Sequence, residues 1–169
     1  NILMAMIAAT KSSLSFKKVV NTIDKLKPVS GRLEQIGSIK NNSKVILDYA
    51  HTPDALEASL KCLKEQFKNS NISIVFGCGG DRDKAKRPMM GKIANKYCDR
   101  VYLTDDNPRH ENPKTIRNSI KRCINKSKIY EISNRANAIN KAILDLKTAD
   151  ILIVAGKGHE KIQEYNKIK

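Results

Sequence analysis

A short turn in the middle of the chain combines three groups that recognise amino acids. Asp106, Asn107 and Arg109 place a carboxylate, an amide and a guanidinium around Pro108. A carboxylate binds an ammonium group and a guanidinium binds a carboxylate through two parallel hydrogen bonds, so this trio suits an amino acid zwitterion. Asp-Asn-Pro is also a common structural turn. The spacing alone leaves both interpretations open.

The glycine-rich segment 77–83 is the second place where binding is expected. Gly77, Gly79 and Gly80 let the backbone approach a ligand closely and expose N–H groups to an anion. It is not the dinucleotide fingerprint, because the third glycine of G-x-G-x-x-G would fall at Arg82. A tight strand-to-helix turn is the alternative explanation. The cations that follow predict either a positive rim or a solvated helix start: Arg82, Lys84, Lys86 and Arg87.

Two histidines in other polar clusters are candidate general bases. His51 lies within 48–53 and His159 within 155–160. A histidine that orients a loop or contacts a ribose explains each equally well. The four cysteines form no C-x-x-C pair, so neither a zinc site nor a redox pair is predicted.

These polar clusters follow predicted strands. Apolar runs rich in β-branched residues alternate with amphipathic helices, and the predicted strands cover 44–49, 72–76, 100–104, 128–132 and 150–154. The alternation predicts an α/β fold with a Rossmann-like, mostly parallel sheet covered by helices on both faces. Ligands of such sheets bind beyond the carboxyl ends of the strands. Four of the five strand ends carry polar clusters, which predicts the position of the site.

The predicted helices of this unit have recognisable starts. Thr52 can cap the first, with Pro53 in the first helical position. Pro88 and Pro113 are expected to open the second and third in the same way. The fourth follows Ser133, and the residues predicted to face inward are Ala136, Ile139, Ile143 and Leu146.

The beginning of the chain is predicted to form a separate small segment. Apolar residues at helical spacing predict short helices over 1–10 and 15–26. Lys27-Pro28-Val29-Ser30-Gly31 interrupts the pattern and is the predicted domain boundary.

The composition limits the class of protein. A length of 169 residues with 40% hydrophobic residues fits one main soluble domain. The net charge of +15 favours anionic partners, although a general lysine bias explains it equally well. No apolar run reaches the roughly 20 residues of a membrane-spanning helix, and the first residues lack the basic region of a signal peptide. A cytoplasmic protein without membrane insertion is therefore expected.

Four motifs in order strongly resemble the MurE branch of the Mur ligase family. They are Asp48-Tyr49-Ala50-His51-Thr52-Pro53, Gly77-Cys78-Gly79-Gly80-Asp81-Arg82-Asp83, Asp105-Asp106-Asn107-Pro108-Arg109 and Ala155-Gly156-Lys157-Gly158-His159-Glu160. The resemblance covers essentially the whole chain. It implies that 1–29 is the end of a central ATP-binding domain with a short helical remnant, and that 30–169 is the C-terminal amino-acid-binding domain, truncated at its end.

The resemblance implies an ATP-dependent ligase that adds meso-diaminopimelate to UDP-N-acetylmuramoyl-L-alanyl-D-glutamate in peptidoglycan biosynthesis. In that family ATP phosphorylates the D-glutamate side chain, and the incoming amine attacks the acyl phosphate. ATP and Mg²⁺ are the implied cosubstrate and cofactor, with the Mg²⁺ ligands expected in another part of the enzyme. The tasks left to this domain are orientation, charge complementarity and exclusion of water.

The matching motif positions imply two sets of binding residues, with no catalytic residue and no metal ligand in this chain. The diaminopimelate set is Arg82, Asp106, Asn107, Pro108, Arg109, Gly156 and Glu160. The nucleotide set is Asn1, Arg32, Asp48 and His51. Arg109 matters most for identity, because the distal end of diaminopimelate bears a carboxylate that lysine lacks.

One departure from the family affects the expected activity. The sequence has no G-x-x-x-x-G-K-[ST] loop for the ATP phosphates, so the chain by itself is not expected to catalyse ligation. A related ligase that adds L-lysine, or one similar to folylpolyglutamate synthase, is the nearer alternative. A basic α/β module that binds nucleic acid is a third, disfavoured by 5% aromatic residues and no recognisable motif.

Overall fold

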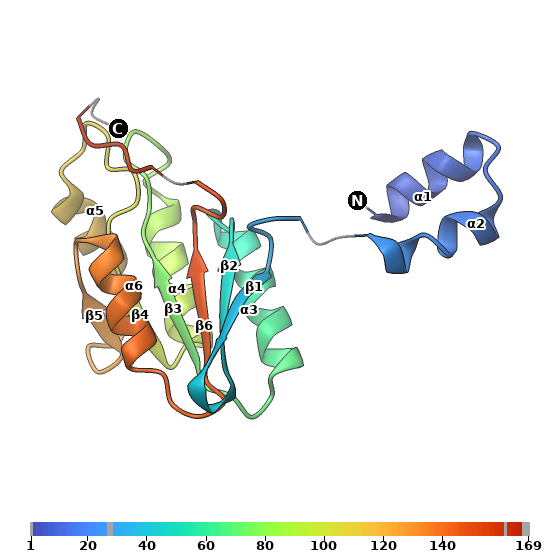
Figure 1. Cartoon of the computed structure of the whole chain (residues 1–169). Helices are drawn as coiled ribbons and strands as arrows, with labels where there is room; N and C mark the ends of the chain where they lie inside the picture. Colours follow the sequence, from blue (N-terminus) through green and yellow to red (C-terminus); the bar gives the residue numbers. More distant parts are fainter. Residues whose placement is uncertain (1, 27–28, 161, 167–169) are drawn as a thin grey trace.

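The computed structural model describes residues 2–26, 29–160 and 162–166, and its main element is a six-stranded sheet (Figure 1). The strand order is β1-β2-β6-β3-β4-β5, with β1 antiparallel to β2 and every other neighbouring pair parallel. The strands are β1 (Glu34–Ile39), β2 (Ser43–Asp48), β3 (Ile72–Phe76), β4 (Arg100–Leu103), β5 (Ile129–Glu131) and β6 (Ile151–Ala155). The five predicted strands and the mostly parallel sheet are confirmed.

Strand β1 was not predicted from the sequence. Its residues, Glu-Gln-Ile-Gly-Ser-Ile, include few apolar side chains, and the register with β2 shifts between Gln35 and Gly37. Ile36 is 56% exposed. An edge strand buries little of its surface, so the apolar pattern that reveals a central strand is weak here.

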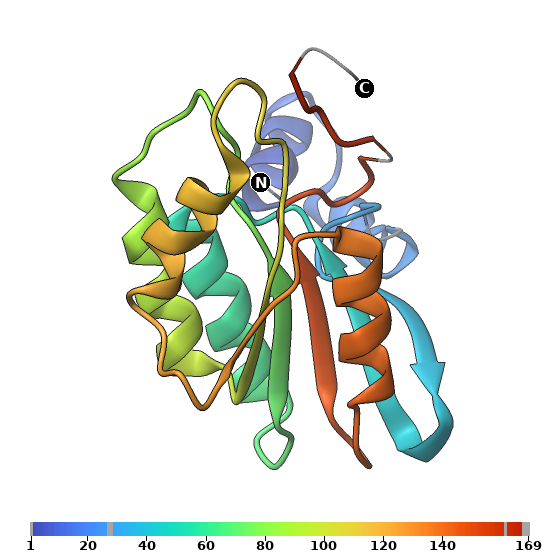
Figure 2. The same ribbon diagram turned by 90° about the vertical axis from the view of Figure 1, so that its left-hand side faces the viewer.

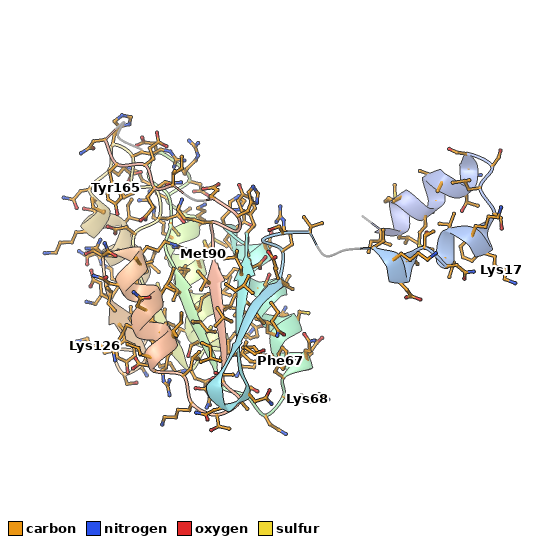
Figure 3. The ribbon with its side chains drawn as sticks, viewed as in Figure 1. Lys17, Phe67, Lys68, Met90, Lys126 and Tyr165 are labelled. Carbon is orange, nitrogen blue, oxygen red and sulfur yellow. The ribbon has the colours of Figure 1, made fainter. Side chains whose placement is uncertain are left out.

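Helices cover both faces of the sheet, as predicted (Figure 2). The helices α3 (Pro53–Gln66), α4 (Lys86–Tyr97) and α5 (Pro113–Lys121) contribute to a core with one face of β2, β3, β4 and β6. Helix α6 (Arg135–Leu144) packs on the other face through Ala138 and Ala142. Met90 of α4 is among the fully buried side chains (Figure 3).

The predicted helix starts are correct at three of four positions. The Oγ1 atom of Thr52 accepts from the N–H of Ala55, and the side chain of Asn112 caps α5 before Pro113. Helix α4, however, begins at Lys86, so Pro88 is its third residue and not its first. The proline is tolerated there because the first four N–H groups of a helix have no partner within the helix.

The inward face of α6 differs from the prediction at one end. Ile139, Ile143 and Leu146 pack against the core, but Ala136 is exposed and Leu146 lies beyond the last helical residue. Arg135 takes the buried position in the first turn instead. A guanidinium at a core-facing position cannot be inferred from hydrophobic periodicity.

The N-terminal segment forms α1 (Ile2–Lys11), α2 (Phe16–Val20) and the 3₁₀ turn η1 (Ile23–Lys25), so the predicted helix over 15–26 is split. None of the described residues in these three elements is buried. Of the predicted boundary residues, Lys27 and Pro28 lie outside the described residues. No helix in the described ranges is long and apolar enough to cross a membrane.

Candidate functional site

Four strand ends meet at one cavity of about 690 Å³, where the polar clusters were expected. It is lined by Tyr49, His51, Thr52, Pro53, Asp54, Gly77, Cys78, Gly79, Arg82, Asp83, Lys86, Met89, Asp106, Asn107, Arg109, Gly156 and Glu160. The first group follows β2, the glycines follow β3, the Asp-Asn turn follows β4 and the last two residues follow β6. Parallel pairing of β2, β6, β3 and β4 brings these ends together because all four strands run in the same direction.

Two glycines after β3 are required by close contact between loops. A Cβ atom on Gly77 would lie 2.2 Å from the carbonyl oxygen of Thr104, and one on Gly80 would lie 1.8 Å from that of Pro108. The N–H of Gly80 donates to the carbonyl of Asn107 at 2.8 Å. The structural explanation of these glycines is therefore sufficient, and it also fixes the glycine-rich loop against the Asp-Asn-Pro-Arg turn.

Arg87 and Glu111 form an ion pair that also holds the glycine-rich loop through hydrogen bonds. The side chain of Arg87 is 2% exposed and donates to both oxygens of Glu111, at 2.8 and 2.9 Å, and to the carbonyl of Gly79 at 3.2 Å. Glu111 also accepts from the N–H of Asp81 at 2.7 Å. The hydrogen bonds from Arg87 lower the pKa of Glu111 to about 2.

The predicted cationic rim is therefore only partly present. Arg87 is buried in its ion pair, and the ammonium of Lys86 donates to the carbonyl of His51 at 2.9 Å. Arg82 and Lys84 are exposed, and Arg82 lines the cavity. The sequence could not separate these four residues, because each follows the same loop and only packing decides which one is buried.

The turn after β4 directs Asp106, Asn107 and Arg109 to the cavity and turns Pro108 away from it. Arg109 has φ +52°, its Nη1 donates to the carbonyl of Gly80 at 2.9 Å, and its Nε lies 3.2 Å from Oε2 of Glu164. The buried Pro108 is in contact with the glycine-rich loop and does not line the cavity. Pro108 shapes the turn; the side chains on either side of it are available to a ligand.

The segment 162–166 runs along this turn and braces it. Gln163 donates to the carbonyls of Asp105 and Asp106 at 3.1 and 2.7 Å, and the N–H of Arg109 donates to the carbonyl of Glu164 at 3.1 Å. Figure 3 shows Tyr165 at the end of the sheet opposite Phe67 and Lys68. This contact could not be predicted from local patterns, because Gln163 and Glu164 follow no strand and belong to none of the four motifs.

The turn after β6 brings Gly156 and Glu160 to the cavity. The N–H groups of Gly156 and Gly158 both donate to the carbonyl of Asp48, at 3.1 and 3.3 Å. Glu160 accepts from Lys157 at 3.1 Å and from the hydroxyl of Tyr49 at 3.4 Å. Partial burial raises the pKa of Glu160, but Lys157, together with Asn107 and Tyr49, outweighs this effect, so the pKa lies below its ordinary value.

The four predicted nucleotide residues lie in different settings. His51 lines the cavity and its Nδ1 is 2.9 Å from the carbonyl of Tyr49. Arg32 places its guanidinium 4.7 Å from the centre of the Tyr49 ring. Asp48 is 4% exposed and accepts from Leu33, Tyr49 and Ser59, so its side chain ties the strand end to the preceding segment. Asn1 lies outside the described residues.

The candidate general base His159 is exposed and does not line the cavity. Tyr49 lines the cavity and belongs to the first motif, but no role was predicted for it from the sequence. Its ring stacks with His159 at 6.1 Å and lies edge-on to His51 at 4.8 Å. Among the described residues, no group of three or more His, Cys, Asp or Glu side chains is placed to hold a metal ion.

Comparison with known proteins identifies the domain that carries this site. Residues 31–158 match the family described as "Mur ligase, glutamate ligase domain". The chain belongs to the Mur ligase family. The match spans the main domain, including all four strand ends that form the cavity.

Individual Mur ligases give a finer comparison. The UDP-N-acetylmuramoyl-L-alanyl-D-glutamate–2,6-diaminopimelate ligase of Rickettsia felis is 48% identical over 164 residues, which cover 96% of this chain and 30% of that protein. A solved structure of a ligase with the same name has a TM-score of 0.75 at 40% identity, covering 97% of this chain and 34% of the other. The chain thus spans about a third of the length of the relatives it matches.

The fold is shared with ligases of other substrates. The bifunctional folylpolyglutamate synthase/dihydrofolate synthase of Yersinia pestis, solved with AMPPNP and a manganese ion, has a TM-score of 0.66 at 20% identity. The matched region covers 86% of this chain and 32% of the Yersinia protein chain. At this identity the likeness shows the fold alone, so the substrate must be argued from the site.

Proposed function

We propose that this chain is the amino-acid-binding part of an ATP-dependent ligase that adds meso-diaminopimelate to UDP-N-acetylmuramoyl-L-alanyl-D-glutamate in peptidoglycan synthesis. The observation that carries the proposal is the convergence of Arg82, Arg109, Asp106 and Glu160 on one cavity. Two guanidiniums beside two carboxylates complement a substrate end that bears both a carboxylate and an ammonium. Diaminopimelate ligases of Rickettsia felis, Rickettsia conorii and Rickettsia prowazekii, 46–49% identical over 96% of this chain, support the same substrate.

Arg109 is the residue on which the choice of substrate depends. Its Nη1 and Nε atoms are engaged by Gly80 and Glu164, which fixes the plane of the guanidinium. Its Nη2 makes no hydrogen bond to the residues that the structure describes and is left for a ligand. A side chain held in this way loses little conformational entropy when it binds a carboxylate.

The same proposal assigns the nucleotide to the region around Tyr49, at the end of β2. Arg32 and His51 flank Tyr49, so an aromatic face and a cation are available there to a base, a ribose or a phosphate. The side chain of Asp48 acts on this region through the backbone it holds. ATP and Mg²⁺ are part of the proposed reaction, and the phosphate loop and metal ligands are assigned to another part of the ligase.

The proposed domain division follows from the same assignment. Residues 1–29 end the central ATP-binding domain and residues 30–169 form the C-terminal domain, supported by a family match that begins at residue 31. The chain alone is proposed to bind the amino acid without catalysing ligation, because its sequence lacks a phosphate-binding loop. A cytoplasmic location is also proposed; it accords with four free cysteines.

Calorimetric titration of the chain with meso-diaminopimelate and L-lysine tests this function. We expect the chain to prefer meso-diaminopimelate, and Arg109→Ala to weaken that binding by about 1.5–3 kcal/mol, the loss of a charge-assisted pair. The exposed Arg122, which does not line the cavity, provides the control variant Arg122→Ala. Its affinity should match that of the wild type.

The alternative functions give different results in the same series. Preference for L-lysine would support the lysine-adding ligase, and equal binding of both amino acids would refute the specificity. Steeply salt-dependent binding to arbitrary DNA, without amino acid binding, would favour the nucleic-acid module.

A further inference from the structure

Lys157 is a buried cation that the family motifs leave without a role. Its side chain is 6% exposed, and it does not line the main cavity. Its Nζ donates to Oδ1 of Asn107 at 2.9 Å and to Oε2 of Glu160 at 3.1 Å, and lies 4.0 Å from Oδ1 of Asp106. One ammonium therefore joins the turn after β4 to the turn after β6.

This contact determines which end of the Asn107 amide reaches the cavity. The amide oxygen accepts from Lys157 and also from the N–H of Glu164 at 3.0 Å. Both neighbours are donors only, so an inverted amide would place its NH₂ group against two N–H donors. Asn107 therefore directs its donor group, and not its oxygen, towards the cavity and the Glu160 carboxylate that lines it.

Lys157 also sets the charge behind the cavity. Asp106 and Glu160 approach it from the ends of β4 and β6, Tyr49 donates to Glu160 from the end of β2, and Arg135 of α6 acts on both carboxylates from within the core. Without Lys157, two converging carboxylates would face the ligand with less compensation. A cation would still be attracted, but a ligand carboxylate would be repelled.

We propose that Lys157 is a specificity-determining positioning residue that makes the cavity accept an amino acid whose distal end bears a carboxylate as well as an ammonium. It acts without touching the ligand, by turning the Asn107 donor towards the cavity and by compensating the Asp106 and Glu160 carboxylates. The proposal rests on the proposed function and concerns the choice between diaminopimelate and lysine. The decisive quantity is therefore the ratio of the affinities for meso-diaminopimelate and L-lysine.

The test compares Lys157→Met and Lys157→Arg with Lys128→Met as the matched control. Lys128 is another partly buried lysine, and its Nζ donates to the carbonyls of Asn95 and Cys98 at 3.3 and 3.2 Å, away from the cavity. For each protein the affinities for meso-diaminopimelate and L-lysine are measured by calorimetry. The titration of the Glu160 carboxyl is followed by carbon-detected NMR in the absence of any ligand.

We expect Lys157→Met to lower the preference for meso-diaminopimelate over L-lysine by about tenfold, the change that one charge-assisted hydrogen bond produces. It should also move the Glu160 titration to higher pH. Lys157→Arg should retain more of the preference than Lys157→Met, and Lys128→Met should change neither quantity. If Lys157 had only a structural role, its replacement would lower the affinities for both amino acids equally.

The inference is overturned if folded Lys157→Met keeps the wild-type affinity ratio, or if its Glu160 titration does not move. The second measurement needs no ligand, so it tests the role of Lys157 in the cluster even if the wild-type chain binds neither amino acid. That last result would count against the proposed function and not against the role of Lys157 in the cluster.

Discussion

Replacing Glu111 by Gln removes the charge that holds the buried Arg87. In the native structure Glu111 accepts two hydrogen bonds from Arg87 and one from the N–H of Asp81, and Arg87 also holds the carbonyl of Gly79. The substitution keeps the shape of the side chain but leaves a guanidinium that is 2% exposed without its counter-ion. An uncompensated buried charge is among the most destabilising single changes in a protein.

The size of the effect follows from the pKa of Glu111. The hydrogen bonds from Arg87, with smaller contributions from the N–H of Asp81 and from Lys84, lower it from 4.5 to about 2. This shift corresponds to about 3 kcal/mol at about 1.4 kcal/mol per pKa unit. The Glu111 side chain is 17% exposed, so screening by solvent reduces the expected loss of unfolding free energy to about 2 kcal/mol. Because the native-state pKa is depressed, this stability is present above about pH 4.5 and is lost as the pH falls towards about 2.

Urea unfolding of wild type and Glu111→Gln, from about pH 7 down to about pH 3, measures this difference. The free energy of unfolding should differ by about 2 kcal/mol near neutrality, and the gap should narrow as the pH falls. Glu57→Gln, at a carboxylate that pairs with Lys61 and Lys96 on the surface, should have a much smaller effect. A gap below about 0.5 kcal/mol near pH 7, or one that stays constant with pH, would refute the reasoning.

Three further predictions concern packing, capping and thiol reactivity. Gly80→Ala should destabilise the fold by about 3 kcal/mol in chemical denaturation, because the new Cβ would lie 1.8 Å from the carbonyl oxygen of Pro108; a neutral effect would show that the two loops can separate. Asn112→Ala should cost about 1 kcal/mol in thermal or urea unfolding, since its side chain caps two N–H groups of α5. Burial raises the pKa of the Cys78 thiol to about 12, so iodoacetamide should label the exposed Cys62 in the native chain and reach Cys78 only after unfolding, as mass spectrometry would show.

Much of the fold could be predicted because its signals are local. The apolar runs of β3 and β6 are buried along their whole length. The start of α3 is set within four residues, by Pro53 in the first helical position and the capping bond from the N–H of Ala55 to Thr52. The weak signal of β1 reflects an edge position that only its neighbour β2 defines. The start of α4 was misplaced because a proline fits any position in the first turn of a helix.

The candidate site divides in the same way. Six of the seven residues assigned to diaminopimelate line the cavity, and their role in binding it stays a prediction. Pro108 does not line it, and Asp48 is engaged by its own surroundings. The sequence indicated which turns meet, because strands of one direction place their carboxyl ends together.

The sequence by itself determined the alternation of strands and helices, the positions of the polar turns and the kinds of group each turn supplies, since these depend on neighbours within one or two helical turns. Only the tertiary structure decided the strand order, the burial of Arg87 and Lys157, and the contact of Arg109 with Glu164. These features depend on residues far apart in the chain, 55 positions for Arg109 and Glu164 and 107 positions for the paired Lys44 and Ile151. Whether a lysine or arginine is solvated or buried is settled by the carboxylates and carbonyls that packing brings to it, and one chain segment alone does not contain that information.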